Sequence, residues 1–214
     1  MKRLYFVLAM TAVLAPAAHA DAYLQAEPRT FELEGAKRVR VEFPIGKFTL
    51  EGDDGPTIRV QVRVDCKDSG YEDCKANARR IRIDHSVNGN VFRLEFSGIS
   101  KNWSGSHMTV EAHVLVPRSL AAELNMGVGK ADVAGIERDL DLELGVGELA
   151  VRGSQAHFRD VEAESGVGDA TIETRLGRVR ERGFIGHSAR WSEGGGTSFI
   201  RAHVGVGQAS VDLR

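Results

Sequence analysis

This chain has few cysteines, few prolines, few aromatic residues and no excess of charge of either sign. Its 214 residues include 2 Cys and 5 Pro, and 7% are aromatic. Two cysteines cannot hold a disulfide-dense toxin scaffold, and 24 glycines with so few prolines do not fit collagen. Lys and Arg number 28 against 30 Asp and Glu, so the chain lacks the basic excess typical of nucleic-acid binding. With 42% hydrophobic residues, the composition fits one globular domain or two small ones.

The one long apolar run lies at the N-terminus. Two basic residues precede an almost uninterrupted apolar stretch over 4–14, and Ala18 and Ala20 supply the small residues of a cleavage site before Asp21. A membrane-spanning helix needs roughly twenty apolar residues, about twice the length of this stretch. The sequence therefore predicts a signal peptide over 1–20, export to the periplasm or cell surface, and no transmembrane segment in the mature protein.

The two cysteines, Cys66 and Cys74, have to be interpreted in the light of that export. In an oxidising compartment, a lone pair most simply forms one disulfide that closes a short loop. A metal site with two cysteines would need His or Cys partners at short spacing, such as CxxC, and none is present. We therefore expect a disulfide between Cys66 and Cys74, and no metal or other cofactor.

Residues 21–119 are predicted to form a series of β-strands around the disulfide loop. Apolar and polar residues alternate in several short runs, which is the period of a strand with one buried face. A turn at 44–46 separates two of these strands, and Asn88-Gly89 is typical of the centre of a type I′ hairpin turn. The one helix candidate is short, around 72–80. The alternating runs lie at residues 39–43, 58–64, 92–96 and 108–116.

Residues 120–214 contain a repeat built around Gly-Val-Gly. Before each first glycine, the small or apolar residues sit at odd offsets from it, and after it they sit at even offsets. Each Gly-x-Gly must therefore absorb a shift of one residue, which glycines do by adopting bend or bulge angles that residues with a Cβ resist. The predicted bend glycines are Gly127, Gly129, Gly145, Gly147, Gly166, Gly168, Gly205 and Gly207, with a degenerate pair at Gly194 and Gly196.

The repeat unit is a strand, a bend and a second strand, and one unit is too small to bury its apolar face alone. Stacking of neighbouring units solves that problem. We therefore expect an all-β fold in which a β-solenoid or β-roll over 120–214 follows the alternating strands of 21–119 and is continuous with them. The alternative is an antiparallel sandwich in which Gly-Val-Gly marks ordinary hairpins.

Three segments of the chain resemble a known family. They are the run VRVEFPIGKFTLEGDDGP at 39–56, the strand that ends in Val-Leu-Val-Pro at 114–117, and the Gly-Val-Gly repeats behind it. Together they look like the DUF4097 family of exported bacterial β-strand-repeat proteins, which carry the label of adhesins. The resemblance covers roughly 31–213. It implies a β-solenoid-like fold and an envelope or surface location, and it brings no catalytic residues to transfer.

No catalytic motif is present in the sequence. HExxH and GxSxG are absent, and Gly-Val-Gly lacks the third glycine and the following helix of a dinucleotide-binding loop. No recurrent aspartate follows the glycines, as it does in calcium-binding repeat rolls. One surface candidate remains, a series of four arginines that either holds an anionic glycan or phosphate or forms a solvated outer face. These are Arg175, Arg178, Arg180 and Arg182.

These observations favour a non-enzymatic protein of the bacterial envelope that acts as a binding, adhesion or structural module. The expected partner is an envelope polysaccharide or another envelope protein. The alternative is a carbohydrate-active enzyme, a lyase or hydrolase, on a β-helix scaffold, because such folds can carry that chemistry in a long groove.

Overall fold

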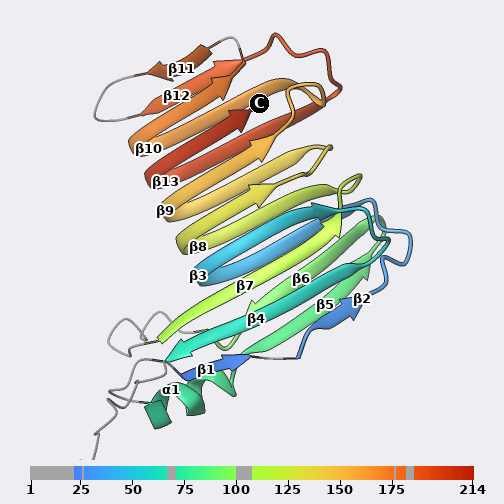
Figure 1. Ribbon diagram of the computed structural model, residues 1–214, viewed down its shortest axis with the longest axis vertical. Helices are drawn as coiled ribbons and strands as arrows, with labels where there is room; N and C mark the ends of the chain where they lie inside the picture. The colour runs from blue at the N-terminus through green and yellow to red at the C-terminus, as the bar shows by residue number, and fades with distance from the viewer. Residues whose placement is uncertain (1–21, 26, 67–70, 100–107, 176, 182–185) are drawn as a thin grey trace, which may run out of the picture.

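The structure is a computed structural model that describes residues 22–25, 27–66, 71–99, 108–175, 177–181 and 186–214 (Figure 1). The predicted signal peptide lies outside the described residues. Thirteen strands join in one large sheet that does not close on itself, so the all-β prediction is confirmed. No helix in the described part of the chain is long and apolar enough to cross a membrane. The elements are β1 (Ala22–Gln25), β2 (Arg29–Phe31), β3 (Arg38–Asp53), β4 (Ile58–Cys66), α1 (Tyr71–Ala78), β5 (Arg82–Asn88), β6 (Val91–Ser97), β7 (Met108–Pro117), β8 (Ala121–Ala134), β9 (Leu140–Gly153), β10 (Phe158–Thr174), β11 (Gly177–Glu181), β12 (His187–Trp191) and β13 (Ser198–Leu213).

Five long strands form the centre of the sheet, and each bends once in its middle (Figure 1). Their spatial order is β3, β8, β9, β13, β10. They pair in parallel and return to the same register after the bend, so equivalent positions of all five strands form rows across the sheet. The spatial order differs from the chain order, because β13 at the C-terminus inserts between β9 and β10.

The bends do not all come from the predicted glycines. Residues 44–46 are a bend within the single strand β3, and Ile45 and Gly46 pair with Val128 and Gly129 of β8. Proline fits at position 44 because only the last residue of each bend has a positive φ. Gly194 and Gly196 lie in the connection between β12 and β13. The five bend units therefore comprise one from the region before residue 120 and four from the region after it.

β3 joins this stack to the remaining strands. The first half of β3 pairs with β6 and its second half with β7, so the sheet divides into two layers there (Figure 1). β5 extends the layer of β6, whereas β4 with β1 and β2 extends the layer of β7. At the far end of the stack, the short strands β12 and β11 pair with the two halves of β10. The hydrogen-bonded ladder thus runs across residue 120, where the repeat region was predicted to begin.

The hairpin between β5 and β6 has a different turn from the predicted one. Asn88 pairs with Val91, so the two loop residues are Gly89 and Asn90. Of these two, only Gly89 has a positive φ, 60°. A positive φ at the first loop position alone is the pattern of a type II′ turn, whereas type I′ requires it at both positions. The prediction of a hairpin is confirmed, with its turn one residue further along the chain.

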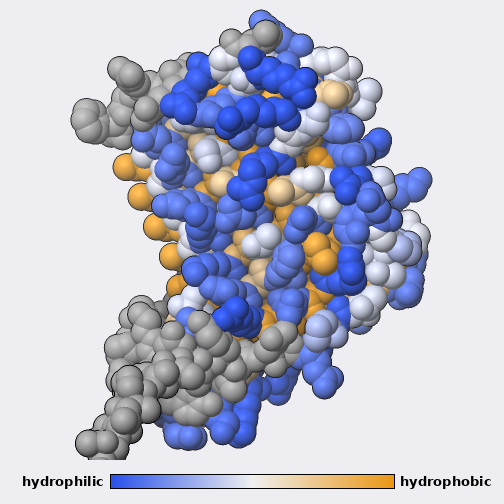
Figure 2. All heavy atoms as spheres, viewed as in Figure 1, coloured by the Kyte–Doolittle hydropathy of each residue, from blue (hydrophilic) through white to orange (hydrophobic). Residues whose placement is uncertain are grey.

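Side chains of the bent strands alternate between a buried and an outward face, and hydrophilic residues cover much of the surface (Figure 2). In β9, Leu142 and Leu144 before the bend and Leu149 and Val151 after it are each at most 2% exposed. Counted from Gly145, the buried residues sit at odd offsets before the bend and at even offsets after it. The predicted change of parity at Gly-Val-Gly is therefore confirmed in this strand.

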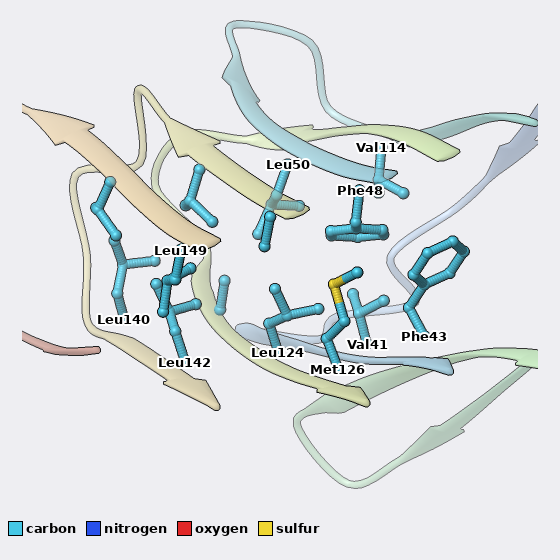
Figure 3. Packing of buried hydrophobic residues seen from close by; sticks show 14 of the residues in the cluster. Val41, Phe43, Phe48, Leu50, Val114, Leu124, Met126, Leu140, Leu142 and Leu149 are labelled. Atoms are coloured by element: carbon cyan, nitrogen blue, oxygen red, sulfur yellow. The ribbon is translucent and has the colours of Figure 1, made fainter. Parts of the chain in front are cut away.

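The core lies between the two halves of the bent strands (Figure 3). Leu50 and Phe48, after the bend of β3, point toward Leu124 and Met126, before the bend of β8. All four side chains are at most 2% exposed. Trp191 of β12 is 7% exposed and belongs to the same cluster, so the predicted packing of this tryptophan in the core is confirmed.

Cys66 at the end of β4 and Cys74 in α1 form the predicted disulfide, with their Cα atoms 5.9 Å apart. Both cysteines are buried. The bond fastens the one described helix to the end of β4, and it is the usual state of a cysteine pair in an oxidising compartment.

Removing this disulfide should weaken the fold moderately. We expect the double replacement Cys66→Ser and Cys74→Ser to lower the free energy of unfolding by about 2.5 kcal/mol, because the bond restricts a short loop of the unfolded chain. Thermal melting checks this value. Dithiothreitol should lower the melting temperature of the wild type and leave that of the variant unchanged, and an equal shift in both would contradict the assignment.

Candidate functional site

The rows across the five bent strands turn each repeated position into a line of side chains. Neighbouring strands in a sheet lie roughly 4.8 Å apart, so each line repeats at that spacing. Any ligand that lies across the stack therefore meets the same position of the repeat several times. One of these rows is apolar and exposed, and another forms the floor of two polar hollows.

The middle residues of the five bends form an apolar row along one edge of the molecule, the bend row. Val146, Val206 and Val167 are 45%, 47% and 49% exposed. Figure 2 shows apolar residues protruding along this edge. A β-branched residue suits the extended backbone on either side of the bend, and a row of this kind is the most exposed apolar feature of the stack. The row consists of Ile45, Val128, Val146, Val206 and Val167.

The outward charges of the stack are largely paired with one another. Glu123 of β8 lies 2.5 Å from both Arg38 and Arg40 of β3. Burial by itself would raise the pKa of Glu123, but the hydrogen bonds from Arg40 and Arg38 outweigh it and lower that pKa. Lys47 Nζ donates to Glu111 Oε1 at 2.8 Å, and this bond raises the pKa of Lys47. Glu123 and Lys47 therefore stay charged at neutral pH, and each is compensated by an oppositely charged partner.

The four arginines predicted as an anion-binding patch are only partly described. Arg178 on β11 forms an ion pair with Glu173 on the adjacent strand β10. Arg175 is exposed in the turn that precedes β11. Arg182 lies outside the described residues, as does the side chain of Arg180. The charge of Arg178 is compensated, and the anion-binding patch stays a prediction.

Arg214 at the end of the chain extends this ion pair into a network. Its guanidinium donates to Asp212 at 2.6 and 2.7 Å and to Glu173 at 3.3 Å. The hydrogen bond from Arg214 lowers the pKa of Asp212. Acidic and basic groups therefore alternate over the second halves of β13 and β10, next to Arg178.

A first hollow of about 340 Å³ lies beside this network, over the second halves of β9, β13 and β10. The hollow forms because one row of the sheet carries small side chains there. These floor residues are Ala150, Ser210 and Thr171. The hydroxyl of Ser210 donates to the carbonyl of Leu149 at 3.3 Å. The charged residues of its walls are Arg152, Arg178, Glu173 and Asp212.

A second hollow of about 400 Å³ continues along the same row, over β4, β7, β3 and β8. Its floor includes Thr49 and Asp132, which are in register with Ala150 of the first hollow. The ion pair between Arg152 and Asp132, at 3.4 Å, joins a residue of the first hollow to a residue of the second. The charged residues of the second hollow are Lys47, Arg63, Lys130, Glu51, Glu111 and Asp132.

The sequence predictions did not include these floor residues. The signal for them was present, because the fifth residue after the first position of every bend unit is small. This position faces outward, whereas the parity pattern of the repeat describes the inward residues. The floor residues are Thr49, Asp132, Ala150, Ser210 and Thr171.

The histidines that the structure describes do not assemble into a cluster. Among residues that the structure describes, no three His, Cys, Asp or Glu side chains lie close enough together to hold a metal ion. His113 Nε2 lies 3.2 Å from Glu51 Oε2. His187 is 4% exposed, and its Nδ1 contacts the carbonyl oxygen of Gly168. His187 therefore ties β12 to the bend of β10.

The comparisons with known proteins show likeness in fold. No family model and no curated protein matches this chain. Among solved structures, a "putative cell adhesion protein" from Clostridium sporogenes has a TM-score of 0.50 and 15% identity, with 90% of this chain and 100% of that chain covered. A "putative adhesin" from Bacteroides fragilis has a TM-score of 0.32 and 11% identity, over 91% and 98% of the two chains. This chain shares an all-β fold with the Clostridium protein, and membership of DUF4097 stays a prediction.

Proposed function

We propose that this chain is an exported, non-enzymatic β-repeat protein of the bacterial envelope, with its bent strands stacked as an open β-solenoid. It works as a binding or adhesion module in the periplasm or at the cell surface. The predicted signal peptide and the disulfide support export. The Clostridium sporogenes protein with a similar fold carries a cell-adhesion description, and we propose the same class of role here.

One observation carries the proposal: the five bent strands keep one register, so each outward position recurs five times at even spacing. Repeat proteins use such extended, periodic surfaces to bind partners along their length. A polymer presents the same chemical group at regular intervals, and it can therefore contact several copies of one position together. Envelope polysaccharide is the polymer that an exported protein meets, and another envelope protein is the second candidate partner.

Attachment to isolated envelope material tests the proposal. We expect purified mature protein to sediment with a bacterial envelope fraction and to remain attached after that fraction has been treated with proteinase K. Periodate, which cleaves vicinal diols of sugars, should abolish the attachment. Loss after proteinase treatment instead would identify an envelope protein as the partner.

Two results would contradict the binding module. One is a protein that stays in the supernatant with every fraction. The other is catalytic release of new reducing or unsaturated sugar ends, abolished by replacement of a single carboxylate, which would favour the glycan lyase or hydrolase.

A further inference from the structure

We propose that the two hollows together form a groove that binds an uncharged, hydroxyl-rich glycan. The proposal rests on the proposed function and specifies the ligand class and the surface that binds it. The floor of the groove is one row of residues, in register over five strands from Thr49 on β3 to Thr171 on β10. Four steps of roughly 4.8 Å give a floor about 19 Å long, which suits an oligosaccharide better than a single sugar.

The charges of the groove favour a neutral ligand. The first hollow is lined by two basic and two acidic residues, and the second by three of each. Arg178 pairs with Glu173, and Lys47 with Glu111. A polyanion needs uncompensated positive charge for its attraction and its salt-dependent affinity. This groove offers none in excess, so an acidic glycan gains little by entering it.

The same ion pairs can recognise hydroxyl groups. A guanidinium has five N–H donors, and a carboxylate has about four acceptor positions, so each keeps free capacity after one mutual bond. A sugar hydroxyl both donates and accepts. Ser210 on the floor uses its proton for Leu149, and its oxygen keeps lone pairs for a further hydrogen bond. Walls that carry both donors and acceptors therefore suit a sugar, because each of its hydroxyl groups can donate one hydrogen bond and accept another.

The position of the groove within the sheet favours a glycan over a peptide. An extended peptide gains most of its affinity at a free sheet edge, where it pairs with unpaired backbone groups. The groove crosses β8, β9 and β13, each of which is paired with a neighbouring strand on both sides. The backbone N–H and C=O groups of these strands already pair with their neighbours, so side chains must recognise the ligand.

Native affinity electrophoresis tests the groove directly. Mature protein is run in gels that contain dextran, laminarin or galactomannan as neutral probes, or alginate as an acidic probe. We expect at least one neutral polysaccharide to retard the wild type, equally at low and high NaCl. Ser210→Trp, which fills the floor, should abolish that retardation. The control Asn125→Trp places the same ring on an exposed position before the bend of β8 and should leave the retardation intact.

The outcomes separate the groove from the wider proposal. Retardation by alginate alone, weakening with salt, or equal retardation of both tryptophan variants would overturn the groove. No retardation by any neutral probe would do the same. If the wild type and Ser210→Trp attach equally to the envelope fraction, the groove fails and the binding module stands. A wild type that does not attach to that fraction contradicts the proposed function itself. Thermal melting shows that both variants are folded.

Discussion

The Gly147→Val variant should lose about 3 kcal/mol of its free energy of unfolding, because it adds backbone strain to a steric clash. Gly147 has a φ of 140°, a conformation that residues with a Cβ rarely adopt. A Cβ at this position would also collide with the carbonyl oxygen of Gly129 on the neighbouring strand β8. The neighbour cannot give way easily, because its own bend is held in the same row.

Urea denaturation measures this loss, and Glu148→Gln is the matched control. Glu148 is the next residue along β9, is exposed, and contacts Lys130 across 3.5 Å on the surface. An exposed ion pair is worth at most about 1 kcal/mol, so the control should unfold nearly as the wild type does. If Gly147→Val and Glu148→Gln unfold alike, the bend does not depend on glycine at this position.

The Phe48→Ala variant should lose about 3 to 5 kcal/mol, because a large buried ring is removed and a cavity remains. Phe48 is 1% exposed. Its ring centroid lies 5.3 Å from that of Phe43 and 6.2 Å from that of Phe96 on β6. Figure 3 shows this ring beside Met126, where the stack of bent strands meets the two layers beyond β3. The ring therefore contacts both parts of the core.

The control for this variant is Thr49→Ala at the next residue of β3. Thr49 faces outward and is partly exposed, so its replacement should change stability by about 0.5 kcal/mol or less. Both variants are compared by denaturant unfolding under the same conditions. A loss below about 1 kcal/mol for Phe48→Ala would show that the two parts of the core do not depend on this contact.

Local patterns in the sequence were enough to determine several parts of this protein. Alternation with period two predicted the strands, and the change of parity at Gly-Val-Gly predicted bends at glycines such as Gly147. The lone cysteine pair predicted the bond between Cys66 and Cys74. Each of these depends on residues close together in the chain, whose conformational preferences act whatever the rest of the fold does.

Only the tertiary structure decided which strands lie side by side. Residues 44–46 looked like a turn and are a bend, because β8 pairs with β3 on both sides of it. β13 inserts between β9 and β10, an arrangement that no spacing between the repeats indicates. The polar hollows exist only once strands far apart in the chain lie side by side. Pairing of this kind depends on contacts between residues far apart in the chain. The sequence patterns describe which face of a single strand is buried, and they do not specify which strands lie next to it.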